Sequence, residues 1–311
     1  MKTFLFFESL VAAALISFSP TPYAQDYRGS NSDSLELRIT RAPSVVCGVI
    51  AKVTGGPTDP DRKDGPYTYT LLVKVNEVLK GNIRDKTLKF ALGGVRPWPQ
   101  LEEWAHDRTP FLWFLDEKGR MGGQGVMSEQ SYICLPPPKN STYIYSMDMT
   151  RLTTADEILG RARAFAARKV VSTHTQILLL PVETEAMGLG DGNLGANLSV
   201  PVEPSLEKLA HRLISDPGSF VKNPDTYVAA ELRADGAGAL RWFKSAENIK
   251  LLKSLLADPG RYATADSDGS YAYPARRAAY ETLKAWGVGL PEPVMSETFP
   301  ANAPGATTTQ P

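Results

Sequence analysis

Two stretches near the end of the chain share one pattern: Leu213-Ile214-Ser215-Asp216-Pro217-Gly218-Ser219-Phe220 and Leu255-Leu256-Ala257-Asp258-Pro259-Gly260-Arg261-Tyr262. The two stretches lie 42 residues apart. The segment 240–243 also aligns with the segment 283–286, at an offset of 43. Each copy joins an apolar helical run to an Asp-Pro-Gly stop, where a helix ends. A period of about 40 to 47 residues with two helices per unit is typical of helical repeats. The pattern predicts a helical module over residues 203–293.

This unit resembles the HEAT repeat over residues 203–287. The resemblance implies a surface for protein partners. We expect Leu240, Leu255, Leu283 and Trp286 to be buried in one shared interior. Because two units are fewer than the roughly three that a stable stack needs, they are expected to pack on the rest of the chain.

Residues 43–135 have the pattern of β-structure. The segment 67–79 alternates apolar and polar side chains, which is the strongest strand signal in the chain. Further strands are predicted at 44–53, 86–92, 110–115 and 125–135. Five short strands with no predicted helix between them favour a small barrel or sandwich.

This region resembles the netrin-like OB barrel shared with tissue inhibitors of metalloproteinases. The resemblance rests on residues 44–53 and 69–75, on Val78-Leu79-Lys80-Gly81 and on Phe111-Leu112-Trp113-Phe114-Leu115. It implies a five-stranded barrel. The inhibitors act through an N-terminal cysteine that reaches a protease zinc, whereas the mature chain is expected to begin near Gln25, so inhibition is kept only as an alternative.

The combined patterns predict an α+β protein, with a small barrel, a β-hairpin and a HEAT-like helical module in that order. Three consecutive prolines at 136–138 indicate a linker. The predicted segments are a signal peptide (1–24), a flexible leader (25–42), the barrel (43–135), the linker (136–152), a helix plus hairpin (153–202), the helical module (203–293) and a disordered tail (294–311).

Lys2, an apolar run at 10–18 and a polar stretch after Ala24 follow the order of a secretory signal, which predicts a secreted or periplasmic protein. That run is too short to span a bilayer. The chain has 34 basic and 34 acidic residues with no long run of like charge, which argues against nucleic acid and anionic membranes as partners. The whole arrangement resembles uncharacterised exported bacterial proteins.

Cys47 and Cys134 are the only cysteines, and both lie in apolar, strand-like contexts. In an oxidising compartment such a pair favours a disulfide, with two buried free thiols as the alternative. Two cysteines supply too few ligands for a metal site, and they lack the Cys-x-x-Cys redox spacing.

The segment 97–108 gathers Trp98, Trp104 and His106 with mixed charge, and these three residues form a possible ligand surface. The alternative is a loop-borne helix whose Trp104 covers the barrel mouth.

Other motifs carry little chemistry. The glycine string at 190–195 is followed by an extended, proline-broken segment, which predicts a hairpin turn and no dinucleotide site. Asp266 and Asp268 precede a glycine, as carboxylates in a calcium loop do, but the remaining ligands of such a loop are missing. Calcium binding here is left open. Ser219 and Lys222 have a serine-lysine spacing without partner motifs.

The sequence therefore predicts an exported, non-enzymatic binding or scaffold protein without a cofactor, acting on another protein or an extracellular polymer. The alternative from another class is a hydrolase that uses His106 or the Ser219/Lys222 pair, but these candidates lack a third group to orient them.

Overall fold

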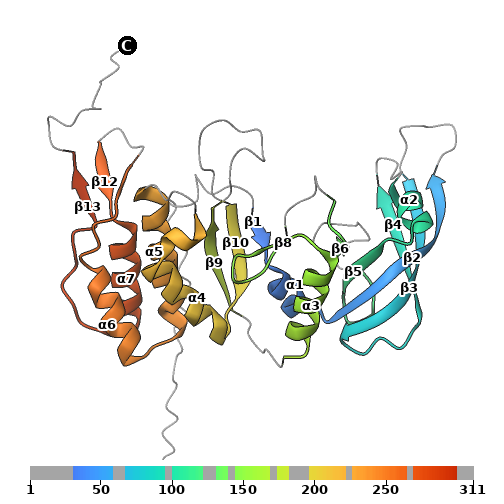
Figure 1. Cartoon of the computed structure of the whole chain (residues 1–311), viewed down its shortest axis with the longest axis horizontal. Helices are drawn as coiled ribbons and strands as arrows, with labels where there is room; N and C mark the ends of the chain where they lie inside the picture. Colours follow the sequence, from blue (N-terminus) through green and yellow to red (C-terminus); the bar gives the residue numbers. More distant parts are fainter. Residues whose placement is uncertain are drawn as a thin grey trace, which may run out of the picture.

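The computed structural model describes residues 31–58, 67–94, 100–121, 131–138, 144–168, 174–181, 196–221, 226–264 and 269–299. Figure 1 shows an elongated α+β molecule with a β-sheet unit at one end and helices at the other. Helices α1 (Leu35–Arg41) and α3 (Ala155–Ala166) lie between the two ends. The predicted α+β class is thus confirmed. No helix in the described part of the chain is long and apolar enough to cross a membrane.

The N-terminal unit is a five-stranded antiparallel sheet in the order β4-β3-β2-β5-β6. Three register shifts between β2 and β3 mark bulges, which bend and twist a strand pair. Within the described residues β4 and β6 are the two ends of the sheet, so the observed pairings do not close it into a barrel. The elements are β2 (Ser44–Pro57), β3 (Tyr67–Lys80), β4 (Thr87–Gly94), α2 (Gln100–His106), β5 (Pro110–Leu115) and β6 (Tyr132–Cys134).

Successive side chains of a strand point to opposite sides of a sheet, and here apolar clusters bury side chains on both faces. Val46 and Trp113 lie in one apolar cluster, which Leu101 of α2 joins. Val45 and Leu112 belong to a second cluster that continues through the helices to Leu283. One face of the sheet therefore shares an apolar core with the helical region, and the other face has a core of its own.

Polar contacts join the sheet to the central helices. The Arg163 guanidinium on α3 donates to the Glu77 carboxylate on β3, with a shortest N–O distance of 2.7 Å. The Lys80 ammonium donates to the carbonyls of Ile39 and Thr40 at 2.6 and 3.0 Å, at the C-terminal end of α1. Cations are favoured there by the unpaired carbonyls of the last turn.

Residues 31–42 are structured, so the predicted flexible leader is wrong over this stretch. β1 (Asn31–Asp33) pairs in parallel with β10 (Ala196–Pro201). The Ser34 hydroxyl then caps α1 by accepting from the N–H of Leu37. The segment was predicted to be a loop because its polar residues carry no strand pattern of their own. Its strand partner lies far along the chain. The apolar side chains that α1 buries completely or almost so are Leu35, Leu37 and Ile39.

The predicted linker at 136–152 also holds secondary structure. β7 (Ile144–Tyr145) and β8 (Arg151–Leu152) pair as a short antiparallel hairpin. α3 follows, and its capping box of Thr154 and Glu157 agrees with the predicted helix start. β9 (Thr175–Leu180) pairs antiparallel with β10, which confirms the predicted hairpin strands.

The C-terminal region is helical as predicted, and α5 packs against both α4 and α7. Leu240, Leu255 and Leu283 are buried as expected, whereas Trp286 is only partly buried and its ring N–H donates to the Arg241 carbonyl at 2.9 Å. β13 pairs with β12, so the predicted disordered tail is wrong over Ser296–Thr298. The elements are α4 (Pro204–Ser215), η3 (Pro217–Phe220), α5 (Thr226–Ala239), η4 (Leu240–Trp242), α6 (Ala246–Leu255), β11 (Tyr262–Ala263), β12 (Ser270–Ala272), α7 (Pro274–Ala285) and β13 (Ser296–Thr298).

Candidate functional site

The aromatic cluster predicted as a ligand surface is partly built into the core. Trp104 on α2 packs edge-on against Phe111, with ring centroids 5.2 Å apart, and it also contacts Tyr132. His106 is exposed at the end of α2. Trp98 lies outside the described residues. Trp104 thus packs against the apolar cluster on one face of the sheet, and the predicted covering of a barrel mouth stays a prediction.

The predicted disulfide between Cys47 and Cys134 is wrong, because both thiols are free. In the sheet, Cys47 of β2 lies opposite Leu112 of β5, and Cys134 of β6 lies opposite Phe111 of β5. Strand β5 therefore runs between the two cysteines. Their side chains face opposite sides of the sheet and lie two strands apart, about 10 Å, beyond disulfide reach. Burial raises the pKa of both thiols, which keeps them in the unreactive protonated form.

Most of the remaining sequence candidates lie outside the described residues, namely the glycine string at 190–195, Lys222, Asp266 and Asp268. The Ser219 hydroxyl donates to the Asp216 carbonyl at 2.9 Å within a short helical turn. Within the described ranges given above, no group of three or more His, Cys, Asp or Glu side chains is placed to hold a metal ion.

A pocket of about 330 Å³ lies between α3 and α4, with α1 and the β7–β8 turn at one side. α4 contributes positions i, i+3, i+4 and i+7, and α3 contributes i, i+3 and i+4, so the residues from each helix share one helix face. Phe165 and Leu209, both buried, form an apolar floor. The lining residues are Arg161, Ala164 and Phe165 of α3, Arg168 two residues after its end, and Ser205, Lys208, Leu209 and Arg212 of α4.

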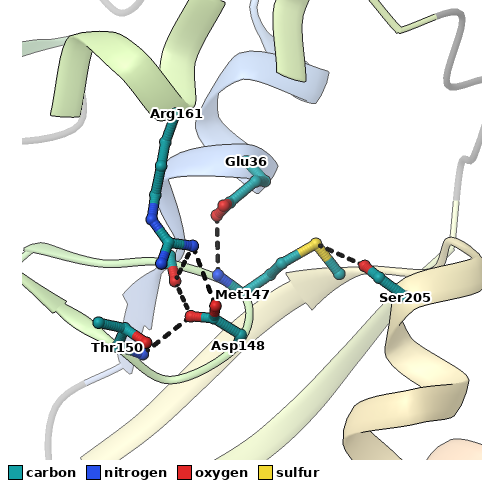
Figure 2. A network of polar contacts seen from close by, with 7 residues as sticks. Glu36, Met147, Asp148, Thr150, Arg161 and Ser205 are labelled. Atoms are coloured by element: carbon teal, nitrogen blue, oxygen red, sulfur yellow. Dashed lines mark hydrogen bonds and ion pairs between the residues drawn. The ribbon is translucent and has the colours of Figure 1, made fainter. Parts of the chain in front are cut away.

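The β7–β8 turn closes one side of the pocket through a hydrogen-bond network, which Figure 2 shows from close by. Arg161 reaches down from α3 and donates through Nη1 to Asp148 Oδ2 at 3.0 Å and to Ser146 Oγ at 2.9 Å. Asp148 also accepts from the Ser146 hydroxyl and from the Thr150 N–H. These contacts fix both the turn and the guanidinium before any ligand arrives.

Glu36 of α1 joins this network through the backbone of the β7–β8 turn. Its side chain accepts the Met147 N–H at 2.8 Å, and the residue is only 5% exposed. Desolvation by burial is the largest influence and raises the pKa of Glu36, favouring the neutral acid. Burial also acts to raise the pKa of Asp148, but the hydrogen bonds from Ser146, Thr150 and Arg161 outweigh it and hold that pKa below its usual range.

Four cationic side chains line the pocket, and two of them have an acidic partner within the described residues. Arg161 pairs with Asp148 at 3.0 Å, and Arg168 pairs with Glu203 at 3.3 Å. Lys208 and Arg212 form no ion pair with any described residue, and Arg212 lies over the ring of Phe220 at 4.9 Å. The pocket therefore carries uncompensated positive charge above an apolar floor.

Sequence reasoning missed this pocket. The helical spacing of basic and apolar side chains on α3 and α4 is readable in the sequence, and it is the signal that could have indicated two matching faces. Glu36 and Asp148, however, lie in segments predicted to be a leader and a linker.

Comparison of the chain with family models, with curated proteins and with solved structures finds no match in any of the three.

Proposed function

We propose that this chain is an exported binding protein, without a catalytic role, that recognises an acidic group on a protein or polymer partner. The recognition site is the pocket between α3 and α4. One observation carries the proposal: four cations line the pocket, and Lys208 and Arg212 have no acidic partner among the described residues. An anionic ligand would supply the missing counter-charge.

The organisation of the pocket suits recognition. Ser205 donates its hydroxyl to the Met147 sulfur at 3.5 Å, and Glu36 and Asp148 accept hydrogen bonds from the β7–β8 turn. Because the lining groups hold one another in place, little conformational entropy is lost when a ligand binds. The hydrolase alternative gains nothing here, since the serine and histidine on which it relied lie elsewhere.

The finer architecture is also part of the proposal. We propose that the five-stranded sheet belongs to an OB-type, netrin-like barrel and that α4 to α7 form two HEAT-like units. The strand order, the bulges of β2 and the position of α2 between β4 and β5 support the first part. The packing of α5 against α4 and α7 supports the second. Export rests on the N-terminal sequence pattern alone.

Calorimetric titration with three aromatic anions, benzoate, phenyl sulfate and phenyl phosphate, tests the proposal. We expect saturable 1:1 binding of at least one of them, weaker at high salt because the pocket is open to solvent. The double variant Lys208→Gln/Arg212→Gln should lose this binding. The control, Lys250→Gln/Lys253→Gln on α6, changes the charge equally on exposed positions away from the pocket and should keep it. Failure of all three anions to bind, or equal binding by both double variants, would refute the function.

A further inference from the structure

The charges around the pocket define what kind of anion it can hold. Asp148 balances Arg161, and Glu203 balances Arg168. Glu36 accepts the Met147 N–H at 2.8 Å and forms no ion pair with a cation among the described residues. Lys208 and Arg212 are left over, so two positive charges on one face of α4 lack a counter-charge within the described structure.

Two arginines that line the pocket keep hydrogen-bond donors for an oxyanion. Arg161 uses only Nη1 for its contacts to Ser146 and Asp148, so its Nε and Nη2 groups are not engaged by described residues. Arg168 likewise contacts Glu203 through Nη1. A guanidinium presents five donors in a planar fork that matches phosphate and carboxylate oxygens. Arg161, whose guanidinium is held by Asp148 and Ser146, thus lines the same pocket as Lys208 and Arg212 of α4.

The pocket has room for a ligand larger than an inorganic ion. A volume of about 330 Å³ falls at the lower end of ligand sites and equals roughly ten water molecules. Phe165, Leu209 and Ala164 line it beside the cations. An apolar body placed against this floor would gain burial that a bare ion cannot.

We infer that the pocket takes a phosphate monoester with a short apolar body, such as an aryl phosphate; this rests on the proposed anion-binding function. A phosphate monoester carries a charge of about −1.5 to −2 at pH 7 and three acceptor oxygens. That charge matches the two unpaired cations, whereas a carboxylate or a sulfate ester supplies a single negative charge. The apolar body matches the floor.

Calorimetry at pH 8, where the monoester is fully dianionic, tests this inference. Phenyl phosphate should bind at least about tenfold more tightly than the isosteric monoanion phenyl sulfate, since one charge-assisted interaction is at stake. It should also exceed inorganic phosphate, which lacks the apolar body. Phenyl sulfate binding within about threefold of phenyl phosphate would overturn the inference and leave anion binding itself intact.

Single variants separate charge recognition from a structural effect. Lys208→Gln and Arg212→Gln should each reduce the phosphate-over-sulfate preference toward one, because each removes one of the two unpaired charges. A merely structural change would weaken both ligands equally and leave the ratio unchanged, which would contradict the inference. Both side chains are exposed, so folding should be unaffected.

A further arm identifies the source of the ester. Capped phosphotyrosine amide presents the same phosphate on a peptide backbone. Binding equal to that of phenyl phosphate supports a protein-borne ester, whereas exclusion of the peptide with retained phenyl phosphate binding supports a free small molecule. Binding of neither compound, while benzoate or phenyl sulfate still binds, overturns the inference.

Discussion

Gly236 on α5 sets the distance between α4 and α5, and replacing it with alanine should destabilise the protein. A Cβ at this position would lie 2.7 Å from the Ala210 carbonyl oxygen and 2.9 Å from Ile214 Cγ1, both on α4. Alanine is favoured over glycine inside a helix by about 0.8–1.0 kcal/mol. Forcing a methyl group into a packed interface costs about 1–3 kcal/mol, and a backbone oxygen cannot move aside like a flexible side chain. We expect a net loss of up to about 2 kcal/mol.

Gly238, on the same helix, provides the matched control. Its Cβ would meet nothing closer than the Gln176 side-chain nitrogen at 3.7 Å, so Gly238→Ala should add up to about 1 kcal/mol through helix propensity alone. Urea unfolding followed by circular dichroism would measure both variants, and their stabilities should change in opposite directions. If Gly236→Ala were as stable as Gly238→Ala, the close packing of α4 on α5 would not exist as described.

Three further predictions concern the core, the buried acid and the cysteines. Leu283→Ala should lower the free energy of unfolding by about 2–5 kcal/mol because Leu283 is fully buried, whereas exposed Lys284→Ala should stay within about 0.5 kcal/mol; equal, negligible effects would contradict the helical module. Burial raises the pKa of Glu36, so the native state keeps its proton after the unfolded state has lost it, and the contribution of Glu36 to stability falls as pH rises above about 4.3. Urea unfolding of Glu36→Gln should therefore show stability that improves relative to wild type between pH 4 and pH 7, and a difference that ignores pH would contradict this. Alkylation and mass spectrometry of the unreduced protein should find Cys47 and Cys134 both as thiols, and a linked peptide pair would refute the β5 register.

Local patterns were sufficient where an element's own side chains decide its conformation. The alternating segment predicted at 67–79 is β3 (Tyr67–Lys80), and the apolar run at 110–115 is β5. The helical module predicted at 203–293 contains α6 (Ala246–Leu255), which Ser245 caps. In each case the periodicity and the bounding turn or cap residues lie within the segment itself.

Prediction failed where the deciding contact is distant in sequence. β1 exists because it pairs with β10, and α1 because its apolar side chains enter a core built by later segments. The disulfide prediction failed because the sequence does not show which face of the sheet each cysteine takes. Both cysteines lie on strands, and only their register against β5 shows that they face opposite sides.

The pocket was unpredictable for the same reason. Glu36 meets the Met147 N–H across 111 positions of sequence, and α3 and α4 are separated by the β9–β10 hairpin. The two helices are nevertheless held in place, because Phe165 of α3 and Leu209 of α4 belong to the same apolar cluster as α1 and β10. Their burial fixes the spacing of the helix faces, and the cations on those faces take their positions from it. The charge pattern of the pocket is therefore a consequence of core packing, and a substitution such as Gly236→Ala, which displaces α4 without touching a cation, should weaken phenyl phosphate binding as well as stability.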